Sequence, residues 1–223
     1  MQTSRFSALS AFAVLFLTAC AAGSHAVTYD LTFNVTDPAQ IENLTNAAMR
    51  VVERRLDNMG VVNPGKEFGT GDTPSLTITV PDKEGADELT RQLTSPFTMS
   101  VMRQAGEGVA ADITVEGHGG FVKTDITAAD FFGIEVGKDE KGAVRARILM
   151  TDAGRQKMNA VFKAEVGRNI GIFVRDRLVS KLAVQSDALT DDLQIQNIPN
   201  ILVAEAFQDD VNVGLHVVYT PKP

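Results

Sequence analysis

Three histidines and one cysteine are the side chains of this sequence best suited to hold a metal or to act as nucleophiles: His25, His118, His216 and Cys20. Zinc sites use such ligands in close pairs, as in C-x2-C or H-x3-H. The histidines here are far apart, and no two have a ligand spacing. The pattern therefore predicts no metal and no cofactor, although a His–carboxylate site assembled from distant segments stays open.

Other residue types that could carry chemistry lack the neighbours that they would need. No G-x-S-x-G motif is present to expose a serine nucleophile. The glycine-containing run at 69–72 has no lysine and precedes no predicted helix, so we interpret it as a turn and not as a phosphate loop. Acidic pairs occur in polar segments typical of solvated loops: Asp139-Glu140, Asp191-Asp192 and Asp209-Asp210. We predict no catalytic residues, and a protein that is not an enzyme.

The composition of the chain argues against one class of function, nucleic-acid binding. The 223 residues carry a formal net charge of −7, with 44% hydrophobic and 22% charged residues. These fractions are ordinary for a globular protein. An acidic chain is repelled by phosphate backbones, and the absence of Trp removes the best stacking side chain. We therefore expect no nucleic-acid partner.

Cys20 follows an apolar run from Phe6 to Leu17, with Arg5 as the only charge before it. The run is too short to span a bilayer but suits a signal peptide. The sequence Leu17-Thr-Ala-Cys20 looks like a bacterial lipobox, in which the cysteine is acylated. We predict a lipoprotein signal peptide at 1–19, lipid attachment at Cys20 and a linker at 20–26. The protein would then be extracytoplasmic and membrane-anchored, on the periplasmic side in a diderm. An ordinary signal peptide cleaved near Ala22 is the alternative.

Residues 27–103 are predicted to form a first folded unit. Apolar residues alternate along 27–35 and 75–80, as expected for half-buried strands, and recur at helical spacing along 38–59 and 84–93. A weak strand at 61–68 and a strand at 97–102 complete the order strand, helix, strand, strand, helix, strand. That order is typical of a ferredoxin-like β-α-β-β-α-β unit.

Two arginines stand on the first predicted helix of this unit. Arg50 is three residues from Glu53, and Arg54 is three residues from Asp57. Residues at this spacing are neighbours on a helix surface. We expect both pairs to lie on the solvated face, with a ligand-binding role for the arginines as the alternative.

Residues 104–143 form a Gly-rich insertion. We expect at most one short strand, at 113–115, and a short capped helix beginning at Thr127. Phe131 and Phe132 are candidate contacts for a partner, because adjacent aromatic residues beside a Gly-rich segment can form an exposed apolar surface. Anchoring of the insertion to the core is the alternative.

Residues 144–223 repeat the order of the first unit. Strands are expected at 144–150, 170–174, 178–184, 194–198 and 215–219, and helices from Thr151 or Asp152 to Gly167 and at 201–207. Arg175 to Arg177 is predicted to be a polar turn between two strands. The fold class is thus α+β, with two ferredoxin-like units of pseudo-twofold character and a small insertion between them.

Two stretches carry a resemblance to a known family. T-D-A-G-R-Q-K-M from Thr151 and V-G-R-N-I-G-I-F-V-R-D-R-L-V-S from Val166 resemble the extracytoplasmic domain of SecD, the membrane-bound accessory subunit of the bacterial Sec translocon. Asp176, Val179 and Ser180 match the family's hairpin, whereas Arg177 replaces its Gly and Lys181-Leu182 replace its Ala-Pro. A helix end typical of SecD is matched by Arg55, Leu56, Asp57, Gly60 and Val61.

The resemblance implies an extracytoplasmic module that meets exported polypeptides. SecD also has membrane helices that conduct protons, and no apolar run after the signal peptide is long enough to be one. We therefore expect a lipid-anchored, non-catalytic SecD-like accessory protein that binds exported polypeptides, Sec translocon components or another envelope partner. The alternatives are an envelope scaffold that keeps the fold without an export role, and a small-ligand-binding or hydrolytic lipoprotein.

Overall fold

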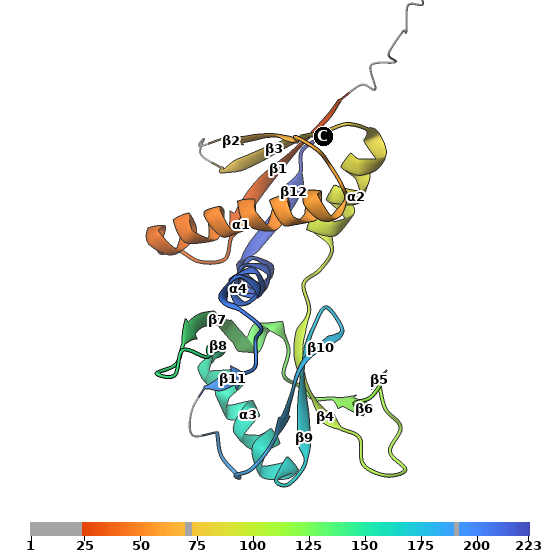
Figure 1. The fold of residues 1–223 in the computed structure, drawn as a ribbon, viewed down its shortest axis with the longest axis vertical. Helices are drawn as coiled ribbons and strands as arrows, with labels where there is room; N and C mark the ends of the chain where they lie inside the picture. The colour runs from red at the N-terminus through yellow and green to blue at the C-terminus, as the bar shows by residue number, and fades with distance from the viewer. Residues whose placement is uncertain (1–23, 70–72, 190–191) are drawn as a thin grey trace, which may run out of the picture.

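The structure is a computed structural model that describes residues 24–69, 73–189 and 192–223. In these ranges the chain forms an α+β fold of two halves that share one helix (Figure 1). The predicted signal peptide and Cys20 lie outside the described residues. The first strand begins at His25, so it includes the last two residues of the predicted linker.

The first half is a four-stranded antiparallel sheet with two helices. Its strand order is β12-β1-β3-β2. Its elements are β1 (His25–Phe33), α1 (Pro38–Asn58), β2 (Gly65–Gly69), β3 (Ser75–Val80), α2 (Lys83–Thr94) and β12 (Val217–Pro221). Alternate residues of β1 and β3, such as Leu31 and Ile78, point into a core that the helices cover, and Val52 and Leu89 pack there from α1 and α2. The predicted periodicities therefore place the correct faces inward.

The second half holds a five-stranded sheet and a three-stranded sheet. Their orders are β10-β9-β4-β6-β5 and β11-β8-β7. The elements are β4 (Met99–Gln104), β5 (Ile113–Val115), β6 (Gly119–Lys123), the 3-10 helix η1 (Ala128–Asp130), β7 (Phe131–Lys138), β8 (Val144–Met150), α3 (Asp152–Glu165), β9 (Asn169–Val174), β10 (Arg177–Ala183) and β11 (Leu193–Ile195). A second apolar core fills the space between these sheets and α3.

The two predicted sequential units are not the sheets that form. The strand predicted to close the first unit, β4, pairs with β9 and β6 in the second half. The last strand, β12, was expected in the second unit but pairs with β1. The alternation of apolar residues determines which face of a strand is buried, and says nothing about which strand lies beside it. The strand assignment was therefore wrong although most of the strands were found.

One helix, α4 (Ile201–His216), joins the two halves (Figure 1). The prediction ended this helix at Phe207 and expected a strand from Leu215, and both boundaries were wrong. Val213 of α4 packs in the first core, and Val211 packs in the second. A helix that is apolar on two faces loses the single stripe by which an amphipathic helix is recognised.

The predicted insertion is more regular than expected. The short helix capped by Thr127 is confirmed as η1, but β6 and β7 were missed. β7 pairs along its length with β8, with one irregularity between Phe131 and Gly133. The segment is therefore an integral part of the second half, and not a loop.

Candidate functional site

The two phenylalanines proposed as partner contacts have different environments. The side chain of Phe131 is 4% exposed and packs in the second core, so for this residue the anchoring alternative holds. Phe132, on the opposite face of β7, is 51% exposed. Its ring meets the imidazole of His216 edge to face, with 6.0 Å between centroids. Only Phe132 is thus placed where a partner could touch it, and that role stays a prediction.

A groove of about 540 Å³ lies beside Phe132, and we call it the amide groove. Residues of α1 form one wall and residues of β7 form the other, and residues of α4 line the groove as well. Its polar lining is rich in side-chain amides: Gln40, Asn43, Asn46, Gln208 and Asn212. An amide both donates and accepts hydrogen bonds, as the main chain of a polypeptide does. Asn43, Asn46 and Phe132 are exposed, so the rim of the groove combines amide and aromatic groups.

His216 connects the two halves beneath this groove. Its Nδ1 lies 2.6 Å from Oδ1 of Asn34, and its Nε2 lies 2.7 Å from the backbone oxygen of Phe132. The Asn34 amide in turn donates to the backbone oxygen of Leu215 over 2.8 Å. His216 was predicted to lie in the last strand, whereas it is the last residue of α4. Its contacts indicate a structural role in holding β7 beside the end of β1.

Two arginines of α1 reach across to α4. Arg50 donates two hydrogen bonds to Asp209, from Nε to Oδ2 (2.9 Å) and from Nη2 to Oδ1 (2.7 Å). Arg54 donates a third to Oδ2 of the same carboxylate (3.1 Å). The hydrogen bonds that Arg50 donates to Asp209 raise the pKa of the Arg50 guanidinium, which burial alone would lower. The expected surface pairs with Glu53 and Asp57 are therefore not made, and Asp209 is a buried helical residue instead of a loop acid.

The outer edge of β7 is closed by amides from α4. Asn212 accepts from the backbone N–H of Ile134 (2.7 Å) and donates to the Ile134 oxygen (3.0 Å). Gln208 accepts from the backbone N–H of Val136 (3.0 Å). Side chains four residues apart on a helix lie on one face, so the two amides follow β7 as a neighbouring strand would. Unpaired strand edges invite further strands, and here α4 occupies that edge.

The other residues singled out in the sequence do not converge on one site. His25 is at the start of β1, and His118 is in the turn between β5 and β6. Within the described ranges no group of three or more His, Cys, Asp or Glu side chains is arranged to hold a metal ion. No helix in those ranges is both long and apolar enough to cross a bilayer. The absence of a metal and of catalysis stays a prediction.

Gln208, Asn212 and His216 were not predicted to link the halves. One signal was present, because five of the six polar residues of 201–216 recur at helical spacing, three or four positions apart: Glu205, Gln208, Asp209, Asn212 and His216, with Asp210 as the sixth. That spacing would have extended the helix to His216. It would not have identified β7 as the element that the polar face meets.

Comparison with known proteins supports the resemblance at the level of the fold. No protein-family model and no curated protein matches the chain. Among solved structures, SecDF from Thermus thermophilus, a translocon-associated membrane protein, is similar with a TM-score of 0.54 at 14% identity, over 90% of this chain and 30% of that one.

Two further SecDF structures are similar at lower scores. A super-membrane-facing form of SecDF gives a TM-score of 0.48 at 15% identity, over 90% of this chain and 30% of that chain. A SecDF described as a membrane component that enhances protein export gives 0.48 at 14%, over 89% and 98% of the two chains. The chain thus spans about a third of two SecDF chains that it matches, and what it shares with SecDF is a fold.

Proposed function

We propose that this protein is a lipid-anchored, extracytoplasmic SecD-like accessory protein that binds exported polypeptides without catalysing a reaction. The observation that carries the proposal is the SecDF-like fold of 90% of the chain. The lipobox-like sequence at Cys20 supports an anchor. We also infer that the first sheet with α1 and α2 is a ferredoxin-like unit whose fourth strand is β12, because its order β12-β1-β3-β2 suits that topology.

The amide groove is the surface that we assign to the polypeptide. An exported chain is unfolded and varies in sequence, so a binding site must recognise what all such chains share. Exposed amides at Asn43 and Asn46 can hydrogen-bond to any main chain, and the ring of Phe132 offers an apolar contact. The volume of about 540 Å³ accommodates a few residues of extended chain.

Site-specific crosslinking tests this assignment. A photo-crosslinking amino acid at Asn43, in cells that express the full chain, should give adducts with polypeptides arrested during export. The matched control is Glu84, an exposed residue at the start of α2 and away from the groove. Adducts at Asn43 and none at Glu84 support the proposal. Equal labelling at both positions, or none at Asn43, contradicts it.

The lipid anchor is tested separately. Metabolic labelling with a clickable fatty acid should mark the wild-type chain and should not mark Cys20→Ser. Since Cys20 is the only cysteine, no other thiol can take up the label. Labelling of the serine variant would show that the lipid, if any, is not on this residue.

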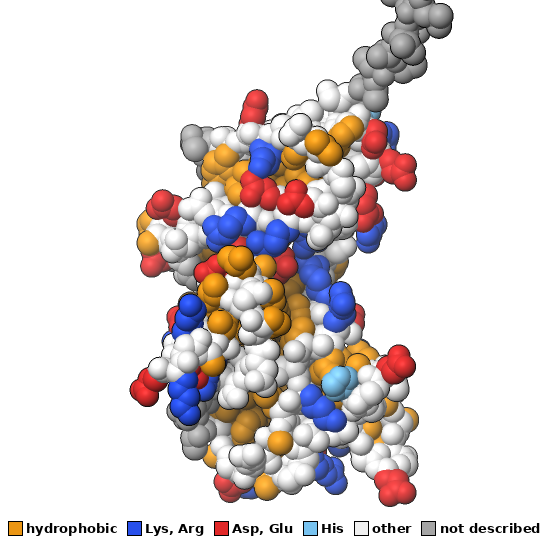
Figure 2. Space-filling model, in the orientation of Figure 1, with side chains coloured by type: hydrophobic (Ala, Val, Ile, Leu, Met, Phe, Trp, Pro, Cys, Tyr) orange, Lys and Arg blue, Asp and Glu red, His pale blue; other side chains and the backbone are white. Residues whose placement is uncertain are grey.

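A scaffold role is the second candidate, and one surface favours it. Figure 2 shows hydrophobic side chains gathered over α4 at the middle of the molecule. Leu202 and Val203, in the first turn of α4, are 71% and 48% exposed. A folded partner would cover such a patch, whereas the amide groove suits an extended chain. Leu202→Asp should then abolish a stable complex that Phe132→Ala leaves intact; the reverse pattern would favour the groove.

A further inference from the structure

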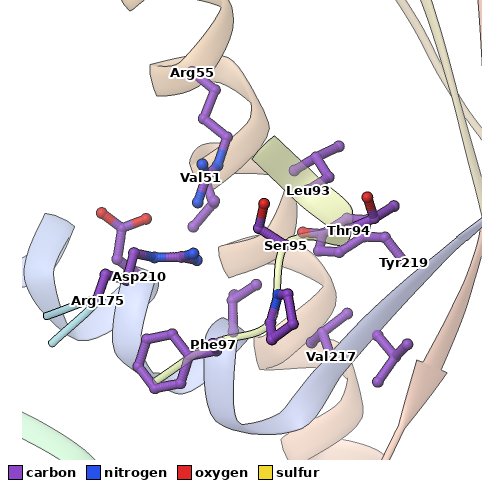
Figure 3. Close-up of a pocket in the computed structure, with 14 residues that line it drawn as sticks. Val51, Arg55, Leu93, Thr94, Ser95, Phe97, Arg175, Asp210, Val217 and Tyr219 are labelled. Atoms are coloured by element: carbon purple, nitrogen blue, oxygen red, sulfur yellow. The ribbon is translucent and has the colours of Figure 1, made fainter. Parts of the chain in front are cut away.

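A second, smaller cavity lies against a different face of α4 from the amide groove. It has a volume of about 140 Å³, and we call it the arginine pocket (Figure 3). α1 contributes Arg55, β12 contributes Tyr219, and the turn between β9 and β10 contributes Arg175. In Figure 3 the guanidinium groups of both arginines and the hydroxyl of Tyr219 point toward the same space. The pocket therefore collects hydrogen-bond donors from both halves of the protein.

Two of these donors are buried without a partner. Within the described ranges, four buried side-chain atoms make no hydrogen bond: Asp30 Oδ1, Glu165 Oε2, Arg55 Nε and the hydroxyl oxygen of Tyr219. The two carboxylate oxygens have cations nearby, at 2.8 Å from Lys222 Nζ and 3.6 Å from an Arg168 nitrogen. Arg55 and Tyr219 both line the arginine pocket, and another nitrogen of the Arg55 guanidinium, Nη1, donates to Oε1 of Gln92 over 3.3 Å. Buried unpartnered donors are costly, and an acceptor in the pocket would satisfy them.

The charge of the pocket also favours an acceptor. Its charged lining residues are Arg55, Arg175 and Asp210, two positive and one negative, which leaves a net charge of +1. Neither Arg55 nor Arg175 makes an ion pair in the part of the chain that the structure describes. Burial and the nearby charge of Arg175 lower the pKa of Arg55. A bound monoanion would oppose this shift, because a nearby negative charge raises the pKa of a guanidinium.

Arg175 lies in the two-residue turn that joins β9 and β10. Arg175 and the residue after it have φ angles of 50° and 59°, the left-handed region that suits glycine and asparagine best. The backbone N–H of Arg175 donates to Thr98 over 2.8 Å, and its guanidinium lies 5.3 Å from the ring centroid of Phe97. Two left-handed residues are the favoured conformation of a two-residue hairpin turn, so the turn itself indicates no ligand. The contacts with Thr98 and Phe97 hold Arg175 beside the pocket.

From this geometry we propose that the arginine pocket binds a single carboxylate group with a short apolar body. A guanidinium offers a planar pair of donors that matches a carboxylate, and the Tyr219 hydroxyl adds a third. The net charge of +1 balances a monoanion and not a phosphate dianion. Apolar side chains complete the wall: Val51, Leu93, Phe97, Val213 and Val217. A cavity of roughly 150 Å³ can hold benzene, so a branched short-chain acid fits.

Two sources can supply this chemistry, a free monocarboxylate or the terminal carboxylate of a polypeptide. The second source rests on the proposed function, and the first does not. The arginine pocket and the amide groove share no lining residue. Failure of carboxylate binding would therefore leave the crosslinking result at Asn43 unaffected, and the two proposals can fail separately.

Titration of the purified full chain with isovalerate tests the proposal. We expect saturable shifts of the backbone amide signals of Arg55, Arg175 and Tyr219 in NMR spectra, and a rise in Tm, because a ligand that binds only the folded state stabilises it. Isovaleramide, which has the same shape and no charge, should do neither. An equal response to acid and amide, or no response to the acid at millimolar concentration, would overturn the proposal. A tripeptide that ends in valine, and its C-terminally amidated form, distinguish the two sources of the carboxylate. If the free tripeptide competes with isovalerate and the amidated form does not, the ligand is the terminus of a polypeptide. If neither form competes, the ligand is a free monocarboxylate.

Two variants separate binding from folding. Tyr219→Phe removes only the buried, unpartnered hydroxyl, so the Tm of the free protein should not fall, and should rise slightly, while affinity for isovalerate falls about tenfold. Arg175→Gln should weaken binding by more than tenfold, and Arg177→Gln, an exposed arginine of the same hairpin, should not. Unchanged affinity in Arg175→Gln and Tyr219→Phe would exclude this pocket as the site.

Discussion

Arg50 of α1 holds the carboxylate of Asp209 on α4 by two hydrogen bonds of 2.9 and 2.7 Å. The pair joins the helix layer of the first half to the helix that both halves share. Its carboxylate is buried and its guanidinium half-exposed. Because a buried carboxylate needs its partners, we expect the fold to depend on this pair.

Asp209→Asn should lower the free energy of unfolding by about 2 kcal/mol, because it removes charge-assisted hydrogen bonds to Arg50 and Arg54. Urea denaturation measures the change. Asp87→Asn is the matched control: Asp87 pairs with Lys83 on the exposed face of α2, and its loss should cost less than about 0.5 kcal/mol. Equal effects of the two substitutions would mean that the Arg50–Asp209 pair does not join the halves.

Asn212→Ala should expose the edge of β7. Both the N–H and the oxygen of Ile134 would lose their partner, which should cost about 2 kcal/mol. Hydrogen exchange of the Ile134 amide should become faster, while the amide of Leu31, in the first sheet, should change only with global stability. Gln208→Ala removes one hydrogen bond and should have the smaller effect. Unchanged exchange at Ile134 would contradict the role given to Asn212.

Asp130 should make stability depend on pH at the acidic end. Burial disfavours the charged carboxylate, but hydrogen bonds from the Thr127 N–H and the Lys157 ammonium together outweigh burial and lower its pKa. Because the folded-state pKa lies below the unfolded value near 4, the stabilisation is present at neutral pH and is lost as pH falls below about 4. Asp130→Asn should therefore be less stable than wild type at pH 7 by roughly 2 kcal/mol.

The difference between Asp130→Asn and wild type should shrink as the pH falls below about 4. Urea denaturation at several pH values gives the comparison, with Asp87→Asn as the control for a solvent-exposed carboxylate. A difference that stays constant down to pH 3 would show that the charge of Asp130 does not contribute.

Gly154 lies where η1 packs against α3. A Cβ there would stand 2.1 Å from the backbone oxygen of Asp130, too close for any side chain. Alanine would gain about 1 kcal/mol of helix propensity, but the clash should outweigh this and destabilise the protein by about 2 kcal/mol net. Gly137→Ala in β7 meets nothing within 4 Å and should change stability by less than about 0.5 kcal/mol. Thermal unfolding of the two variants measures the difference in stability. A Gly154→Ala variant as stable as the wild type would contradict the close packing of η1 against α3.

Local patterns predicted most of the elements because each is specified by residues close together in the sequence. β3 and β8 have the predicted bounds, and the helix capped by Thr151 ends near Gly167 as expected. The turn at Arg175 and Asp176 was also predicted, and it is confirmed. Such features depend on alternation, capping and backbone preference, which a short segment determines by itself.

The arrangement of the sheets depends on contacts between distant segments, and here the prediction was wrong. Nothing in Val217 to Pro221 indicates that this strand belongs beside β1 instead of β8 or β9. The same holds for the site: Phe132 was singled out, but the amides of α4 and the partner of Asp209 became visible only once α4 was placed between α1 and β7. Arg55 and Arg175 are 120 positions apart in the sequence numbering, and no pattern connects them.

The pairing of β1 with β12 has a consequence for the order in which the protein is made. The ribosome synthesises β1 long before β12, so one side of β1 has no neighbour until every other element of the fold has been made. Contacts between such distant segments form slowly, because a long loop must close first. A chain built in this way can complete its first sheet only after its last strand has been made.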